Sequence, residues 1–308
     1  MKNYIFFIFL LIIISSGYFF LKLNFFTEPK KLEVNKTQIN YNNQISSYEN
    51  ELQICQNTKF NHNNITYSID SNCKENKIKR IEEAFKIIEK EVGEIKFIRV
   101  NSDADIDVIC QNIKIPTETK GYFIAGEGGP TSLINTSLFC IIEKGKVLLY
   151  KEKDYCDYPN VELHEILHVF GFGHSDNERS IMFNTSFCNQ ILTKDIIDEM
   201  KRLYSIKNLP ELYFEDVEIK KHGLYIDFNL KIKNSGLIEA KNVSLLIKEY
   251  PSYKKIDSFE LSDIEYGAGK SINVENLRIP LKTKKLIFEI FSIQEEIDKE
   301  NNFLEVEL

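Results

Sequence analysis

The sequence has no tryptophan, only five histidines among its 308 residues, and no long block of lysine or arginine. Its 46 acidic residues outnumber the 39 basic ones, which gives a net charge of −7. Proteins that bind phosphate backbones carry a basic patch or stripe, so we expect no nucleic-acid partner. With 43% hydrophobic and 28% charged residues, the chain is neither disordered nor fibrous. Its length predicts about two domains.

A long apolar run stands at the N-terminus. Residues 4–23 read YIFFIFLLIIISSGYFFLKL and contain one charge, Lys22, near the end of the run. About twenty such residues are enough to cross a bilayer as a helix. We therefore predict a transmembrane signal anchor over residues 1–23, in preference to a cleaved signal peptide or a buried core helix. Residues 24–58 are polar and rich in Asn, Lys and Ser, and are predicted to form a stalk or pro-segment.

No two of the six cysteines are spaced as C-x-x-C, which excludes a zinc ribbon and a thioredoxin-type motif. An even number of cysteines behind an export signal predicts three disulfides in an oxidising compartment, in preference to six free thiols in a cytosolic protein. Of fifteen connectivities we favour pairing between neighbours in the sequence, 55 with 73, 110 with 140 and 156 with 188. The disulfide candidates are Cys55, Cys73, Cys110, Cys140, Cys156 and Cys188.

Regular signals for secondary structure follow the polar segment. Apolar residues recur at spacings of three and four from Ile78 to Val92, which predicts an amphipathic helix closed by Gly93. Two more helices are predicted, one from about Pro159 to Phe170 and one capped by Thr193. Runs of β-branched residues predict strands at 65–69, 95–100, 106–110, 122–125, 140–142 and 147–150, the last two around a turn at Lys144-Gly145.

The pattern changes at Pro210. Beyond it, apolar residues alternate with other residues in three runs, at 224–232, 243–247 and 286–290, and turn residues separate the runs. About six or seven strands and no helix predict a β-sandwich over residues 210–308. This part of the chain contains no cysteine, so no disulfide joins its sheets.

Three of the five histidines fall within one eleven-residue segment, HEILHVFGFGH. His164 and His168 are four apart on a predicted helix, so they project from one face and can meet a single cation. Glu165 lies about 100° round the helix, where it can contact a metal-bound water without being a ligand. Gly171 can end the helix with a positive φ and turn the chain back, so that His174 supplies a third nitrogen. Three imidazoles leave one position of a zinc ion open for water, as in a catalytic site.

This segment, followed by Ser180-Ile181-Met182, resembles the metzincin signature H-E-x-x-H-x-x-G-x-x-H with its Met-turn, and is most similar to the matrixins. The similarity covers about residues 59–206 and includes Ala104-Asp105-Ile106 and residues 192–204. It implies an α+β metzincin-type fold, with a twisted, mostly parallel sheet and three helices. The implied roles are one catalytic Zn²⁺ on His164, His168 and His174, Glu165 as general base, and Met182 as a hydrophobic floor beneath the metal.

Three features depart from the matrixin pattern. Phe183-Asn184 stand where matrixins commonly have Tyr-Pro, which leaves the shape of the specificity pocket open. No P-R-C-G-like cysteine precedes the domain, and we interpret Cys55 as a disulfide partner, so latency by a thiol is not predicted. Many matrixins carry a second, structural zinc, which His62 and His222 alone cannot hold.

The resemblance implies an endopeptidase in which Glu165 takes a proton from zinc-bound water and the hydroxide attacks a peptide carbonyl. We expect an extended substrate to pair with an edge strand. The residues predicted for this edge are Tyr122, Phe123, Ile124, Ala125 and Gly126. Calcium is a further ion without support, because Asp103, Asp105 and Asp107 alternate as a solvated strand edge would.

The C-terminal domain resembles the cell-adhesion-related (CARDB) sandwich of bacterial and archaeal surface proteins, in residues 232–247 and 298–308. This resemblance implies spacing or binding at a cell surface. We therefore predict a membrane-anchored zinc endopeptidase that faces outward and acts on protein or peptide substrates. Three alternatives stay open: an enzyme secreted after signal cleavage, an adhesion protein whose metzincin domain is catalytically unused, and a zinc hydrolase that acts on a non-peptide amide.

Overall fold

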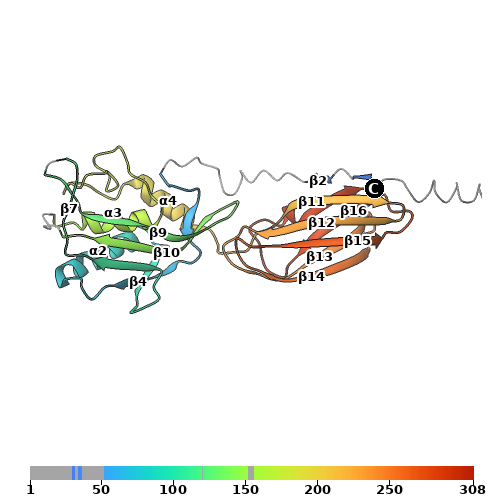
Figure 1. The fold of residues 1–308 in the computed structure, drawn as a ribbon, viewed down its shortest axis with the longest axis horizontal. Helices are drawn as coiled ribbons and strands as arrows, with labels where there is room; N and C mark the ends of the chain where they lie inside the picture. The colour runs from blue at the N-terminus through green and yellow to red at the C-terminus, as the bar shows by residue number, and fades with distance from the viewer. Residues whose placement is uncertain (1–29, 32–33, 37–51, 120, 152–155) are drawn as a thin grey trace, which may run out of the picture.

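The computed structural model describes residues 30–31, 34–36, 52–119, 121–151 and 156–308, which form two units side by side (Figure 1). Within these residues, the first unit has one main sheet and three α-helices, and the second has strands and one short 3-10 helix, Glu300–Asn302. The predicted transmembrane segment 1–23 and most of the predicted stalk lie outside the described residues. In the described part of the chain, no helix is both long and apolar enough to cross a bilayer.

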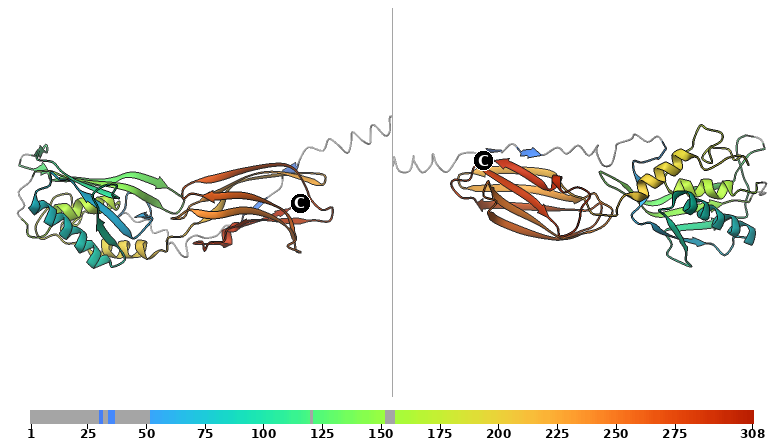
Figure 2. Two further views of the ribbon diagram at one scale, coloured as in Figure 1. Left: turned by 90° about the horizontal axis from the view of Figure 1, so that it is seen from below. Right: turned by 180° about the vertical axis from the view of Figure 1, so that it is seen from behind.

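The main sheet of the first unit is mostly parallel, as predicted. Its parallel strands lie in the order β3 (Thr58–Phe60), β10 (Cys140–Leu149), β6 (Ile106–Cys110), β4 (Asn64–Ile69) and β5 (Lys96–Arg99). β9 (Gly126–Asn135) pairs with β10 in the antiparallel direction, and no other described strand pairs with its outer side. Figure 2 shows the β9–β10 hairpin reaching from the first unit toward the second.

The strands predicted at 122–125, 140–142 and 147–150 are present in part or whole, but their arrangement differs from the prediction in two ways. Residues 140–142 and 147–149 belong to the single strand β10, because the chain passes through an irregularity at Lys144-Gly145 and does not turn. A β-carbon on Gly145 would lie 2.2 Å from Cγ1 of Val169, so the glycine lets the sheet pass close to a helix. Residues 123–124 form β8 (Phe123–Ile124), which pairs with β7 (Ile115–Pro116) and not with the main sheet.

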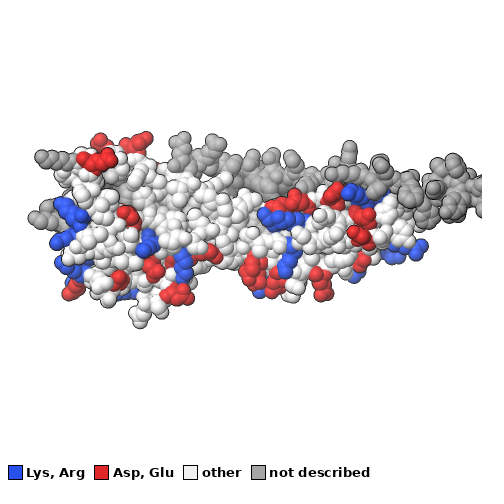
Figure 3. All heavy atoms as spheres, in the orientation of Figure 1, with Lys and Arg blue, Asp and Glu red and all other residues white. Residues whose placement is uncertain are grey.

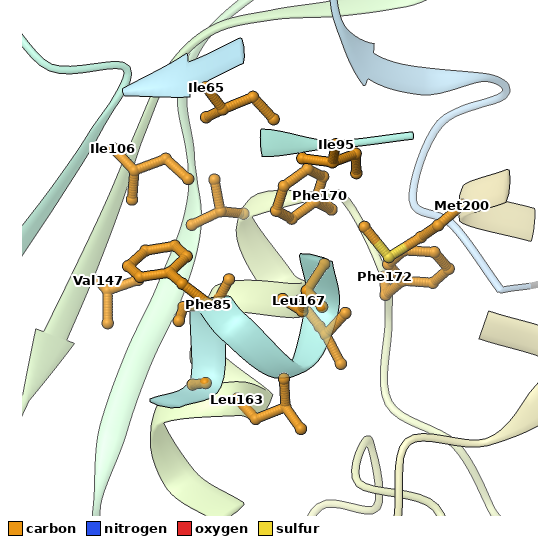
Figure 4. Packing of buried hydrophobic residues seen from close by; sticks show 14 of the residues in the cluster. Ile65, Phe85, Ile95, Ile106, Val147, Leu163, Leu167, Phe170, Phe172 and Met200 are labelled. Carbon is orange, nitrogen blue, oxygen red and sulfur yellow. The ribbon is translucent and has the colours of Figure 1, made fainter. Parts of the chain in front are cut away.

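Three helices lie on one face of the main sheet (Figure 2). α2 (Glu75–Val92) buries its apolar face and ends at Gly93, which has a φ of +83°, as predicted. α3 (Asn160–Val169) is buried over most of its surface. α4 (Lys194–Ser205) begins after Thr193 as predicted, but the Thr193 side chain makes no capping hydrogen bond. Figure 4 shows side chains of α2, α3 and the sheet packed into one core.

All six cysteines are paired, as predicted. The disulfides are Cys55–Cys140, Cys73–Cys110 and Cys156–Cys188. Only the last agrees with the predicted pairing of sequence neighbours. The other two follow from the parallel sheet: Cys55 and Cys140 stand where β3 and β10 begin side by side, and Cys73 and Cys110 stand where β4 and β6 end.

The second unit is a β-sandwich, and seven of its strands lie beyond Pro210. One sheet contains β11 (Leu212–His222), β12 (Tyr225–Asn234) and β15 (Gly269–Arg278), and the other contains β14 (Lys255–Ile264), β13 (Ala240–Tyr250), β16 (Lys285–Phe291) and β17 (Phe303–Glu307). Residues that alternate in the sequence, such as Phe228, Leu245 and Phe288, fill the space between the sheets. The alternation therefore predicts the buried faces of β12, β13 and β16 correctly.

The described residues of the predicted stalk that precede residue 37 belong to the sandwich. β1 (Lys30–Lys31) pairs with β11, and β2 (Val34–Lys36) pairs with β17. The segment therefore adds one strand to each sheet, which its polar composition did not predict.

The tip of the β9–β10 hairpin contacts the sandwich. Phe139 and Ile141 of the first unit and Leu237 of the second are fully or almost fully buried in one apolar cluster. The Thr136 hydroxyl donates a hydrogen bond of 3.0 Å to the carbonyl of Ser235. The edge strand of the main sheet is thus joined, at its far end, to the sandwich.

Candidate metal centre

The first two histidines of the triad are oriented by hydrogen bonds to backbone carbonyls. His164 Nδ1 lies 2.7 Å from the carbonyl oxygen of Ile181, and His168 Nδ1 lies 2.7 Å from that of Phe172. Because a carbonyl oxygen can only accept, each ring carries its proton on Nδ1 and presents a lone pair at Nε2. This arrangement is typical of metal-binding histidines.

The two Nε2 atoms lie 3.0 Å apart, and one ring nitrogen of His174 lies within 4.8 Å of both. Lone pairs at that separation repel each other unless they share a cation. Two nitrogens bound to one tetrahedral zinc ion at about 2.0–2.1 Å are about 3.3 Å apart, so the donor set fits zinc. Among the described residues, this is the one group of three or more metal-binding side chains.

Burial keeps the triad in the state that binds metal. Burial lowers the pKa of His164 to about 4, against a smaller raising effect of the hydrogen bond to Ile181. Burial also lowers the pKa of His168. Both imidazoles are therefore neutral near pH 7, and metal binding there releases no proton from them. His174 is the exposed member of the triad.

The turn between His168 and His174 depends on Gly171. Its φ is +81°, and its N–H donates to the carbonyl of His168 at 3.0 Å. A β-carbon at Gly171 would lie 2.7 Å from Cγ2 of Thr58. Both the conformation and the space therefore favour glycine, and the predicted end of the helix is confirmed.

Residues 52–58, which we predicted to belong to the stalk, hold this turn in place. Gln53 donates a side-chain hydrogen bond of 2.9 Å to the carbonyl of Phe170. The N–H of Ile54 donates a 2.9 Å hydrogen bond to the carbonyl of Gly171, and the carbonyl of Leu52 accepts one of 2.9 Å from the N–H of Gly173. These residues therefore pack as part of the first unit. Sequence analysis missed them because they show no hydrophobic period.

The segment that contains Met182 lies beside the triad. Met182 is 1% exposed, and its carbonyl accepts a 2.8 Å hydrogen bond from the N–H of Ser175, the residue after His174. The carbonyl of Ile181, one residue before, accepts the hydrogen bond from His164. These two bonds tie the predicted Met-turn to both ends of the ligand segment.

Glu165 is 6% exposed and lies against the start of β9. A β-carbon on Gly126 would lie 2.6 Å from Cγ and 2.9 Å from Oε1 of Glu165. A β-carbon on Gly128 would lie 1.9 Å from the Glu165 carbonyl oxygen. The edge strand approaches α3 this closely because these positions are glycine. The signal in the sequence is GEGG at 126–129, since clustered glycines in a strand mark a close backbone approach.

Two further polar residues lie near Glu165, and sequence analysis missed both. Tyr150 is 6% exposed, and burial raises its pKa. A hydrogen bond with Glu127 and the negative charges of Glu127 and Glu165 raise the same pKa further. Tyr150 is therefore a neutral hydroxyl beside two carboxyl groups.

The other metal candidates do not form a site. Asp103 pairs with Lys144, Asp105 accepts hydrogen bonds from Thr66 and His62, and Asp107 accepts one from Ser68. His222 lies in the sandwich and pairs with Asp227. None of these side chains belongs to a group placed to hold a metal among the residues that the structure describes.

Residues 59–205 match the family model of the matrixins, peptidase family M10. High choriolytic enzyme 1, a hatching enzyme zinc-protease from the medaka fish Oryzias latipes, is similar at 16% identity and a TM-score of 0.32, over 46% of this chain and 90% of that one. A domain described as part of a cell surface protein of Methanosarcina acetivorans is similar at 12% identity and a TM-score of 0.26, over 32% of this chain and 93% of that one. No curated protein matches the chain.

The mostly parallel sheet, the three helices and the histidine triad define a zinc metallopeptidase of the metzincin class. Residues 59–205 belong, within that class, to the matrixin family, and this domain is a metalloendopeptidase of the matrixin kind. The family depends on zinc, and the triad is placed to bind one ion.

Proposed function

We propose that the chain hydrolyses peptide bonds of extracellular or cell-surface proteins, with Glu165 as the general base. The observation that carries this proposal is the position of Glu165, which follows the ligand His164 on α3 and lies against the first residue of the edge strand β9. The carboxyl group therefore lies between the metal ligands and the strand along which a substrate would bind. No other described carboxylate combines these two neighbours.

The residues of the chain divide the reaction between them. His164, His168 and His174 would hold the zinc ion, which when bound makes a water molecule acidic and stabilises a developing oxyanion. The Glu165 carboxylate would accept a proton from the attacking water and would return it to the leaving amine. The neutral hydroxyl of Tyr150 forms a hydrogen bond with Glu127 and lies within reach of the charge of Glu165.

The substrate would bind as an extended strand. The outer side of β9 is unpaired among the described strands, so its backbone groups are available for main-chain hydrogen bonds. Of the five residues that we predicted for the edge, only Gly126 belongs to β9. The proposed substrate strand therefore lies along residues 126–135 and not along residues 122–125.

The location of the enzyme is part of the same proposal. The apolar run at 4–23 would anchor the chain in a membrane, with the metallopeptidase domain outside, or would be removed on secretion. Three disulfides support an oxidising compartment in both cases. The CARDB-like sandwich would then act as a spacer or binding module at the cell surface.

The proposal is tested by digestion of a mixed peptide library with the full chain, read by mass spectrometry with and without a chelator. We expect cleavage that the chelator abolishes and added zinc restores. A second candidate function is adhesion, with a metzincin domain that is catalytically unused; the presence of the sandwich favours it. Absence of cleavage by a chain with one zinc ion bound would support this candidate. Cleavage of non-peptide amides without cleavage of peptides would favour a different hydrolase.

A further inference from the structure

Three loops form the end of the sandwich that is far from the metallopeptidase domain. They are residues 222–225, 250–255 and 278–285, which connect β11 to β12, β13 to β14 and β15 to β16. The C-terminus lies at the same end (Figure 1). We call these three loops the distal surface.

The loops of the distal surface are basic, whereas the loops at the opposite end of the sandwich are acidic. Glu249 and Glu307 lie beside the distal loops, in one pocket with Lys282, Lys284 and Lys285. The three distal loops contain six basic residues and no acidic residue; the basic residues are Lys254, Lys255, Arg278, Lys282, Lys284 and Lys285. The loops at the other end, residues 235–239, 265–268 and 292–302, contain six acidic residues and one basic residue. Figure 3 shows basic side chains at the distal end of the sandwich, with acidic side chains next to them. Among the described residues, only Lys285 of the six forms an ion pair, with Glu305 and Glu307.

Large apolar side chains stand exposed among these lysines. Leu281 is 80% exposed and Tyr253 is 58% exposed, while Tyr225 and Tyr250 are each 40% exposed. Leu281 contributes little to the core at this exposure, and tyrosine is a residue that membrane interfaces favour. Apolar tips ringed by lysine are the pattern of a surface that lies in the headgroup region of a bilayer.

The N-terminal segment reaches the sandwich at the same end. Lys30 pairs in β-sheet register with Lys221, which directly precedes the loop at 222–225. The first described strand therefore begins beside the distal surface, and in the sequence the apolar run at 4–23 ends only a few residues before Lys30. The charge, the exposed apolar residues and the point of attachment are three separate observations that favour the same partner.

We propose that the distal surface docks on the anionic lipids of a bilayer. Leu281 and Tyr253 enter the interface, and the lysines that form no ion pair contact phosphate groups of the anionic surface. The sandwich then stands on the membrane and holds the metallopeptidase domain at the opposite end, away from the lipid. This inference rests on the anchored location proposed above, but not on the catalytic role of Glu165.

The absence of tryptophan from the chain permits a direct test. Leu281→Trp in the full chain places a single tryptophan on the distal surface. Ile293→Trp is the matched control, because Ile293 is 69% exposed at the opposite end of the same sandwich. Both variants are bound to vesicles of phosphatidylcholine and phosphatidylglycerol, with brominated acyl chains as quencher. We expect the Leu281→Trp emission to shift to shorter wavelength and to be quenched severalfold more than the control.

The contribution of charge is tested in the Leu281→Trp chain. Lys282→Glu should reduce the quenching, whereas Lys270→Glu, the same charge change at the start of β15 at the opposite end, should not.

Equal quenching of the Leu281→Trp and Ile293→Trp reporters, on chains that sediment with the vesicles, would overturn the docking surface and leave the anchor intact. Failure to sediment would overturn both. An emission shift that appears without vesicles when the protein concentration is raised would identify a second copy of the chain as the occupant. That result would also overturn the proposal. Cleavage of soluble peptides should be unchanged in all four variants.

Discussion

Glycine residues determine how closely the main sheet approaches the catalytic helix. Gly126 and Gly128 of β9 and Gly145 of β10 face α3, where an added β-carbon would lie 1.9–2.6 Å from an atom of Glu165 or Val169. Real β-carbons essentially never come within 3.0 Å of such atoms. The glycines therefore fix the separation of strand and helix, and Gly126 in addition leaves room for the Glu165 side chain.

We predict that Gly126→Ala slows catalysis without removing zinc. The new methyl group would displace the Glu165 carboxyl group but contacts no histidine ligand, and a misplacement of about 1 Å can cost roughly 10²-fold in rate. The expected result is a fall in kcat of roughly 10- to 100-fold, with KM and zinc content nearly unchanged. Gly129→Ala is the matched control, because nothing lies within 4 Å of its added β-carbon. Equal kcat values for the two variants would show that Gly126 does not position the base.

At the scale of elements, the sequence predicts the helices and strands whose apolar residues recur with a regular period. α2 was predictable because Ile81, Phe85 and Ile88 recur along one face that is buried, and the histidine spacing on α3 predicted one face for two ligands. β9 was not predictable along its length, because its glycines serve a close approach to α3 and weaken the strand pattern. Residues 52–58 were also missed, since backbone and side-chain hydrogen bonds, and not apolar periodicity, hold them beside the metal centre.

We predict that this N-terminal segment supports zinc binding. Gln53→Ala removes the hydrogen bond to Phe170 and leaves the turn that carries His174 less firmly held. Loss of such supporting groups typically weakens metal binding by roughly 10- to 100-fold, which a competition titration with a chromophoric chelator measures. Gln111→Ala, at an exposed position, should leave zinc affinity unchanged. An affinity of the Gln53→Ala variant equal to that of the unaltered chain would refute the role of the segment.

At the scale of the whole molecule, the two units are connected through the elements that matter for function. β9 is the proposed substrate strand at one end, and its hairpin tip packs on Leu237 of the sandwich at the other. The alternating pattern predicted the sandwich itself, but not this contact, because Phe139 and Leu237, which meet there, lie in loops without a period. β1 and β2, which add one strand to each sheet, were not predicted either, because the segment that contains them is polar and shows no hydrophobic period.

The stability of the sandwich should depend on pH through Glu211, near the junction of the units. Glu211 is fully buried, and burial raises its pKa from 4.5 to about 8, against the opposing effect of hydrogen bonds from Asp298 and Asn301. Because the folded state holds the proton more tightly, the stabilisation is fully present below pH 4.5 and is lost as the pH rises through about 8. We expect the free energy of unfolding to fall by roughly 2–4 kcal/mol over that window. Urea unfolding followed by circular dichroism measures it.

Glu211→Gln provides the control for this pH dependence, because the amide keeps the size of the side chain and does not titrate. Its unfolding free energy should change much less between pH 4.5 and 8 than that of the unaltered chain. An equal change in both proteins would assign the dependence to other groups, of which Glu296 is the first candidate, since burial raises its pKa as well.

The most direct test of the whole account is the activity of Glu165→Ala together with its zinc content. The three histidine ligands are untouched, so we expect one zinc ion per chain, as in the unaltered protein. Removal of the general base should reduce chelator-sensitive cleavage of the peptide library by roughly 10²- to 10⁴-fold. Cleavage at the original rate by a clean, zinc-replete preparation of this variant would contradict the assignment of Glu165 and the mechanism built on it.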